Sequence, residues 1–267
     1  MLYPNTGTRC LTLIDPDKRP REITTMKIAI LPVLSDNYIH VLRDDETNTT
    51  IVVDPAEAPP VIKFLDESGQ HLTHIFLTHH HGDHIGGVKG LKEKYPDCKV
   101  YGFKDDQHRL PALTHPLRDG DKVNLAGATF DVWHLPGHTT GHIAYISQDS
   151  KLAFTGDVLF GMGCGRLFEG EPEQLFDAMR RLKTLSPDTK IYCTHEYTVT
   201  NGHFAKSVLP DNKKILDRLN ASIAIREKGQ FTVPLTLQTE LETNPFLLAK
   251  DLDTCRDFRK QRDVFKA

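Results

Sequence analysis

Short apolar runs follow one another along the chain from Met26 to about Thr198. They are rich in Val, Ile, Phe and Tyr and are bounded by Gly, Pro or Asp, which is typical of β-strands. The predicted strands are 27–31, 38–43, 50–53, 74–78, 99–103, 122–125, 128–135, 143–147, 151–155 and 190–194. Helical spacing of apolar residues predicts helices at 59–68, 88–95 and 172–185. Because several strands arrive before any helix intervenes, we expect two β layers flanked by helices rather than a doubly wound sheet.

The pattern changes after about Val199. Residues 212–228 carry an apolar stripe, residues 253–265 resemble a basic helix, and the stretch between them, with Pro234 and Pro245, is irregular. We therefore expect a catalytic domain over 26–198 and a small helical C-terminal domain over 199–267. Residues 1–25 are polar and without periodicity, and we interpret them as an N-terminal extension. A mitochondrial targeting segment is the weaker interpretation, because acidic residues interrupt the few basic ones.

Composition narrows the class of protein. The net charge of −3 is spread over both signs, and no apolar run approaches the ~20 residues of a membrane span, so we expect neither a nucleic-acid nor a membrane partner. Five cysteines without a Cys-x-x-Cys pair are typical of the reduced thiols of an intracellular protein. We expect a cytoplasmic monomer. The unusual feature is the 14 histidines, many of which lie in two short stretches.

The first stretch, Thr78-His-His-His-Gly-Asp-His84, directly follows a predicted strand, where functional sites are commonly built. Imidazole and carboxylate together suit Zn, Fe or Mn better than Ca or Mg. The candidate ligands are His79, His81, Asp83 and His84. Four ligands this close in sequence do not easily converge on one ion, so two neighbouring ions are expected. Strand alternation places His80 on the opposite side, and it is left out.

Three further strand ends carry the same residue types. They bring His138 in a Gly-His-Thr-Thr-Gly-His segment, Asp157 after Gly156, and His195 in Thr-His-Glu-Tyr. A single histidine-rich loop can be solvated and without function. The repetition at several strand ends favours a metal site.

This ordered set of motifs resembles the metallo-β-lactamase superfamily, and within it the glyoxalase II (hydroxyacylglutathione hydrolase) family, from Met26 to the C-terminus. The resemblance implies an α+β fold of the αββα type with metals at one edge of two sheets. It also implies that one ion is held by His79, His81 and His138, and the other by Asp83, His84 and His195. Asp157 would bridge the two ions.

Such a pair of ions, ~3.5–4 Å apart, lowers the pKa of a shared water and polarises a carbonyl, which suits hydrolysis. The catalytic residues expected are therefore Asp157 and Asp83, the latter as a ligand first and in proton handling second. Neither a Ser-His-Asp arrangement nor a cysteine nucleophile is needed. Cys164 and Cys193 are better interpreted as small buried residues.

Two segments narrow the substrate. Residues 158–170 resemble the glyoxalase II loop that ends in Gly-Cys-Gly-(Lys/Arg), and residues 259–263 resemble that family's Arg-x-x-Lys signature. The resemblance implies a glutathione thioester, S-D-lactoylglutathione, whose carboxylates suit guanidinium groups. The substrate contacts implied are Arg166, Phe168, Tyr197, Arg259 and Arg262.

Three features depart from the family pattern. Arg166 and Arg262 stand where lysine is common, Phe168 stands where tyrosine is common, and Thr194 replaces a glycine. None of these changes removes an expected metal ligand, so they bear on substrate selectivity and not on the metal site. Two alternatives stay open: a persulfide dioxygenase with one iron, and a binding module that has kept only the fold.

Overall fold

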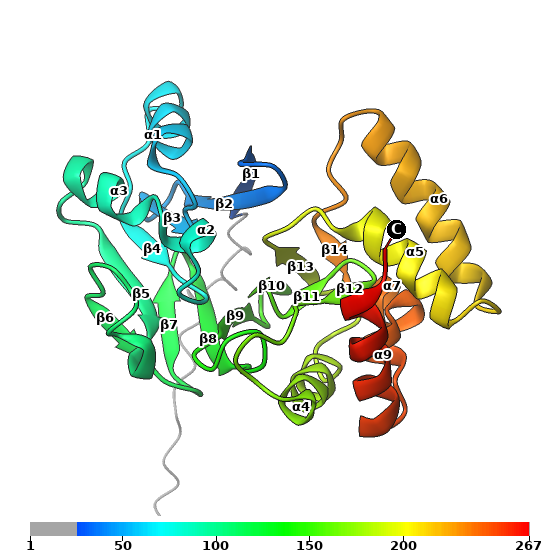
Figure 1. The fold of residues 1–267 in the computed structure, drawn as a ribbon. Helices are drawn as coiled ribbons and strands as arrows, with labels where there is room; N and C mark the ends of the chain where they lie inside the picture. Colours follow the sequence, from blue (N-terminus) through cyan, green and yellow to red (C-terminus); the bar gives the residue numbers. More distant parts are fainter. Residues whose placement is uncertain (1–25, 267) are drawn as a thin grey trace, which may run out of the picture.

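The computed structural model describes residues 26–266, which form two facing six-stranded sheets with helices on their outer sides (Figure 1). The first sheet contains, in spatial order, Lys27–Val33 (β1), Asn37–Asp44 (β2), Thr49–Val53 (β3), His74–Phe76 (β4), Lys99–Phe103 (β5) and His115–Leu117 (β6). The second contains Leu235–Thr236 (β14), Lys190–Cys193 (β13), Leu152–Gly156 (β10), Ile143–Ser147 (β9), Ala128–His134 (β8) and Lys122–Leu125 (β7). A small hairpin is formed by Leu159–Phe160 (β11) and Gly163–Cys164 (β12).

The helices divide into two sets. Those on the first sheet are Ala58–Glu67 (α1), Gly82–Ile85 (α2) and Val88–Lys94 (α3), with a 3₁₀ turn at Lys104–Asp106. The remaining helices are Pro172–Leu182 (α4), Thr198–Val208 (α5), Lys213–Glu227 (α6), Leu237–Thr243 (α7), Pro245–Leu248 (α8) and Leu252–Val264 (α9). Figure 1 shows the first set and α5–α9 on opposite sides of the β layers. This arrangement confirms the predicted αββα architecture.

Apolar residues fill the space between the sheets and the space beneath α1 and α3. Between the sheets, Phe76 stacks on Tyr145 with ring centroids 4.2 Å apart, and both side chains are fully buried. Beneath the helices, Val61, Leu65 and Leu91 are also fully buried. Close packing in these two cores restrains the strands, so the ends of the strands hold the loops that follow them in defined positions.

The direction of the strands decides where the polar side chains gather. Strand β3 runs parallel to β4, and β10 runs parallel to β13. Parallel neighbours end at the same edge of a sheet. The segments that follow β3 and β4, and those that follow β10 and β13, are therefore paired at one edge.

Most predicted elements are confirmed, with ends shifted by a few residues, but the C-terminal part needs a correction. The stretch interpreted as irregular contains β14, α7 and α8, and α5 was not predicted at all. The helices α7 and α8 start at polar caps: Thr236 accepts the Thr239 N–H, and Asn244 accepts the Phe246 N–H. Caps satisfy the free N–H groups of very short helices whose apolar periodicity is too brief to read.

Two predictions concern residues that the structure does not describe or properties of the whole chain. The N-terminal extension, including its possible targeting role, lies at 1–25, outside the described residues. Among the helices of residues 26–266, none is long and apolar enough to span a bilayer.

Candidate active site

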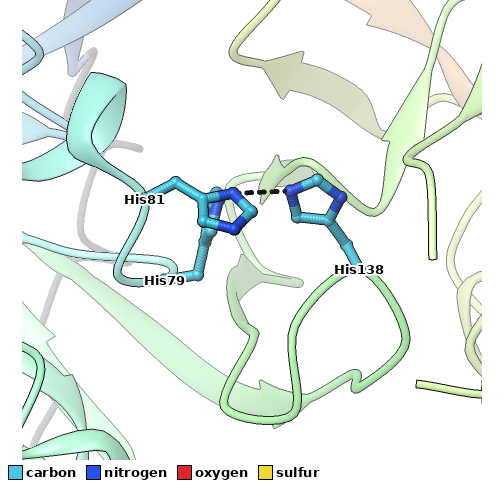
Figure 2. Close-up of side chains that lie close together, drawn as sticks. All are labelled: His79, His81 and His138. Atoms are coloured by element: carbon cyan, nitrogen blue, oxygen red, sulfur yellow. Dashed lines mark hydrogen bonds between the residues drawn. The ribbon is translucent and has the colours of Figure 1, made fainter. Parts of the chain in front are cut away.

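The predicted metal ligands come from four strand ends and one short helix, and they meet in one place. Strand β4 leads into His79 and His81, and the short helix α2 adds Asp83 and His84. The other ligands follow β8, β10 and β13, and they are His138, Asp157 and His195. Figure 2 shows the rings of His79, His81 and His138 directed toward one another from two separate loops.

We call His79, His81 and His138 the three-histidine group. The Nδ1 atom of His81 lies 3.0 Å from Nε2 of His79 and 3.0 Å from Nε2 of His138. A single ring nitrogen carries at most one proton and cannot pair fully with both partners. Ligands at ~2.0–2.1 Å from a tetrahedral zinc ion stand about 3.3 Å apart. The spacing therefore fits nitrogens that surround an ion.

We call Asp83, His84 and His195 the mixed group. The Nε2 atom of His84 is buried and has no hydrogen-bond partner among the described residues. It lies 3.6 Å from Oδ2 of Asp83, and Nε2 of His195 lies 3.4 Å from the same oxygen. A buried polar atom without a partner is costly, and a cation would satisfy it. The donor set thus fits a second ion.

Asp157 lies between the two groups. Its Oδ2 is 3.4 Å from Nε2 of His138 and 3.4 Å from Nε2 of His195, while its Oδ1 is 3.5 Å from Nε2 of His84. The carboxylate is therefore in reach of ligands from both groups. This placement is the one that the bridging role requires.

Residues that the sequence reasoning missed orient the imidazoles. Asp54 Oδ2 lies 3.1 Å from Nδ1 of His84, and Asp36 Oδ1 lies 2.7 Å from Nδ1 of His195. The counterpart of these carboxylates at His138 is the backbone carbonyl of Arg166, at 2.7 Å from Nδ1. Such partners fix the tautomer and direction of a metal-binding ring. Asp54 follows a strand and could have been found by that signal, whereas Asp36 lies in a turn and could not.

The backbone around Asp157 is closely packed. Gly156 has a φ of +49°, and a Cβ there would lie 2.4 Å from the Thr78 hydroxyl, so only glycine fits. The Asp157 N–H donates to Nε2 of His142 at 3.0 Å. Thr194, one of the departures from the family pattern, donates its hydroxyl to Asp157 Oδ1 at 2.6 Å. The departure therefore adds a contact to the central carboxylate.

The electrostatics differ between the two groups. Burial, reinforced by the neighbouring imidazoles, lowers the pKa of His81 to about 4 and the pKa of His79 well below its usual value. Burial also opposes a charge on His195, but the carboxylates of Asp157, Asp83 and Asp36 outweigh it and raise its pKa to about 11. In the protein without ions, the three-histidine group is thus neutral and the mixed group retains a proton.

The structure also places the residues that were excluded from the site. His80 points away from the ligands, as alternation predicted, with Nδ1 3.4 Å from Oδ2 of Asp106. Cys164 and Cys193 are buried, and burial raises the pKa of the Cys164 thiol to about 11, so it is not a ready nucleophile.

Two adjoining cavities contain the predicted substrate contacts. A cavity of ≈ 360 Å³ over the metal ligands and one of ≈ 200 Å³ toward α9 share Phe160, Arg166 and Tyr197. The larger is also lined by Phe168, and the smaller by Arg259 and Arg262. The two cavities therefore adjoin, one over the ligands and the other beside the arginines of α9.

The three arginines that line the cavities differ in side-chain exposure and in hydrogen bonding. The Arg166 side chain is 59% exposed, whereas Arg259 is buried and donates to the carbonyls of Cys164 and Gly165, each at 3.2 Å. Arg262 donates to Oδ1 of Asn201 at 3.2 Å. The guanidinium of Arg259 thus holds the β12 loop as well as lining the smaller cavity.

Two facing sheets with a histidine and aspartate cluster at one edge define a protein of the metallo-β-lactamase fold. The model of the Metallo-beta-lactamase superfamily matches residues 35–195, and the model of the Hydroxyacylglutathione hydrolase C-terminus matches residues 196–267. A curated hydroxyacylglutathione hydrolase of Methylococcus capsulatus is 40% identical over 90% of this chain and 99% of its own, and one of Crocosphaera subtropica is 48% identical over 83% and 88%. The chain belongs to the hydroxyacylglutathione hydrolase family.

A solved structure supports the same fold. The di-iron-bound form of TTHA1623 superposes with a TM-score of 0.59 at 26% identity, covering 83% of this chain and all of its own. Superfamily membership, together with three overlapping groups of candidate ligands that share His79 and His84, supports a binuclear metal site.

Proposed function

We propose that this protein hydrolyses S-(2-hydroxyacyl)glutathione thioesters, with S-D-lactoylglutathione as substrate and glutathione and D-lactate as products. The observation that carries the proposal is that the two cavities adjoin: the candidate metal ligands line one, and Arg259 and Arg262 line the other. A glutathione thioester requires both kinds of residue: metal ligands near its carbonyl group and arginines near its carboxylates. The family names of the relatives support the same reaction.

The proposal assigns two divalent ions to the site, zinc first and iron or manganese as alternatives. The three-histidine group would hold one ion and the mixed group the other, with Asp157 within reach of ligands from both groups. Bound there, the ions supply Lewis acidity and an activated water. Imidazole with carboxylate suits all three metals, and a neighbour of the same fold is known in a di-iron-bound form.

We assign to the residues of the chain the binding and orientation of the substrate. Arg166 and Arg262, with Tyr197, face the glutathione part, while Phe168 offers an exposed apolar edge beside the ligands. Asp83 is a ligand whose side chain stays 37% exposed, and Asn37 donates to its Oδ2 at 3.0 Å. This carboxylate is therefore the one placed to exchange a proton with the cavity. We propose that residues 199–267 serve as the substrate-binding part.

The experiment is hydrolysis of S-D-lactoylglutathione by the purified protein, followed by the loss of thioester absorbance. The expected result is rapid turnover that a chelator abolishes and that zinc or iron restores. Absence of turnover by protein shown to contain two ions would contradict the substrate and leave the metal site standing.

The comparisons do not favour the alternative of a persulfide dioxygenase, because the C-terminal part matches the hydroxyacylglutathione hydrolase model. A monomeric state and a cytoplasmic location stay predictions from the sequence.

A further inference from the structure

A network of polar and charged side chains around Arg109 adjoins the loops of the three-histidine group. The proposed reaction assigns no role to it. Arg109 is at its centre. Its Nε donates to Oδ1 of Asp106 at 2.9 Å, and its Nη1 donates to Oε1 of Glu169 at 2.5 Å. The same guanidinium reaches the Thr140 hydroxyl at 3.2 Å and Nε2 of His80 at 3.2 Å. One side chain thus joins four segments.

Three of those segments carry or contact members of the three-histidine group. His80 lies between two members of the three-histidine group, and Thr140 lies two residues after the third. Glu169 follows Phe168, whose N–H donates to the carbonyl of His138 at 3.2 Å. Asp106, at the end of the 3₁₀ turn, contributes no ligand and serves as the fixed point. The network therefore spans the two loops that carry the three-histidine group.

The contacts of Glu169 and Asp106 are close and specific. Glu169 Oε2 accepts the backbone N–H of Thr140 at 2.8 Å and its hydroxyl at 2.9 Å. Asp106 is buried, and a Cβ at Gly141 would lie 2.3 Å from its Oδ2, so the carboxylate packs directly on the loop backbone. The next residue, His142, stacks on His79 with centroids 4.7 Å apart. A shift of the network would consequently move ligands on both loops.

Charge makes the network depend on Arg109. Burial opposes a charge on Glu169, but Arg109 and the hydrogen bonds from Thr140 outweigh it and lower its pKa to about 2. Without the guanidinium, only the His80 imidazole would remain close to both carboxylates, at 3.4 Å from Asp106 and 3.6 Å from Glu169. The forked geometry also matters, because a lysine cannot bridge two carboxylates and a hydroxyl in one plane.

We propose that Arg109 is a positioning residue of the metal site, which sets the distance between the loop of His79 and His81 and the loop of His138 through Asp106, Glu169 and Thr140. The inference rests on the proposed metal-dependent function. It concerns geometry of the ligands, not contact with substrate.

The test compares zinc affinity and steady-state kinetics of wild type, Arg109→Gln, Arg109→Lys and Glu169→Gln. Zinc affinity is measured by competition with a chelating dye. Loss of outer partners typically costs 10–100-fold in metal affinity or activity. For Arg109→Gln we expect a loss of that order, about 10–100-fold, in the affinity of one ion and in kcat, with little change in KM. We expect Arg109→Lys to recover part of the zinc affinity and part of kcat, because lysine restores the positive charge but not the forked geometry of the guanidinium.

Matched controls separate positioning from stability. Arg180→Gln removes an arginine paired with Asp177 on the exposed surface of α4, and Glu173→Gln removes a glutamate paired with Arg256. Neither control should change zinc affinity or kcat. If the network only stabilises the fold, the Arg109 and Glu169 variants will melt at lower temperature but bind zinc and turn over as wild type does, and the proposal is overturned.

The outcomes remain distinguishable from failure of the proposed function. If the wild type binds no zinc, the metal site itself is wrong, and the inference fails with it. If the wild type binds two ions and only the variants lose one, the inference holds whatever the substrate. If Arg109→Gln does not fold, the test relies on Arg109→Lys and Glu169→Gln. Zinc affinity equal to that of the wild type in both variants would overturn the proposal.

Discussion

The three-histidine group and the mixed group are neighbours that share Asp157, yet they are built differently. The first is made of imidazoles alone, and its outer partner at His138 is a backbone carbonyl. The second stands among carboxylates, and its imidazoles are oriented by Asp54 and Asp36. Burial therefore lowers the pKa values of the first group, whereas the carboxylates raise the pKa of His195 in the second.

The difference teaches how each group accepts a cation. A metal ligand must be deprotonated. The three-histidine group is already neutral at pH 7, so an ion displaces no proton from it. The mixed group holds a proton on His195, which an ion must displace. The ion affinities of the two groups are thus expected to differ in their dependence on pH, steep for the mixed group and nearly flat for the three-histidine group.

The most disruptive change removes the shared carboxylate. We expect Asp157→Ala to lose both ions and to lower kcat/KM by more than about 100-fold, beyond the usual effect of an outer partner. The physical reason is that Asp157 faces ligands from both groups. Metal content and turnover measure the effect. Asp188→Asn, an exposed carboxylate paired with Lys151, is the control. Retention of one tightly bound ion would show that the groups are more independent than the geometry indicates.

The pH dependence tests the comparison directly. The pKa of His195 is raised, so the proton is bound below about pH 11 and is released as pH rises or as an ion enters. Ion affinity at the mixed group should therefore rise about tenfold per pH unit for each proton displaced. Affinity at the three-histidine group should be flat above about pH 5, since the pKa of His81 is about 4. Zinc titrations between pH 6 and 8 measure both. Equal slopes of zinc affinity against pH at the two groups would contradict the proposed difference in their protonation.

A substitution at Asp54 should affect one group only. Asp54 accepts from the Thr78 N–H at 2.8 Å and from its hydroxyl at 2.7 Å, besides facing His84. Asp54→Asn keeps the shape and tolerates the left-handed backbone, but turns an NH₂ toward those donors. We expect the ion of the mixed group to bind about 10–100-fold more weakly, and the other ion to be retained. Metal stoichiometry at limiting zinc measures this. Loss of both ions to the same extent would mean that Asp54 supports the whole edge.

The smallest effect is expected at Asp36, whose side chain is 35% exposed. Asp36→Asn removes one of the carboxylates that raise the pKa of His195. We expect affinity at the mixed group to fall by about tenfold or less, since the site is wetter. We also expect the pKa of His195 to fall, so His195 should lose its proton at lower pH, which imidazole NMR signals in the protein without ions can report. An unchanged pKa would mean that Asp157 and Asp83 hold the proton on His195 without help from Asp36.

Much of this site could be predicted from local sequence. His79, His81, Asp83 and His84 lie within six residues, and the alternation expected of an extended segment placed His80 on the other side, where it lies against Asp106. The strand ends that carry His138 and Asp157 were visible for the same reason. Apolar runs bounded by Gly and Pro also located most strands.

Other features depended on contacts between distant segments, which no local pattern records. The burial of Arg259 against the carbonyls of Cys164 and Gly165 could not be inferred from its place on a basic helix. The short elements of the C-terminal part are held by Glu240 and Asn244, which bond to the β11–β12 hairpin across about 80 residues of chain.

The sequence by itself determined the candidate ligand set and the layered architecture, because periodicity and strand-end placement are local properties of the backbone. Only the tertiary structure decided which ligands face which carboxylate. Asp36 is 159 residues from His195, and Arg109 is 60 residues from Glu169. The pKa values and the outer contacts follow from distances in space, which the sheet topology sets when parallel strands bring their ends to one edge.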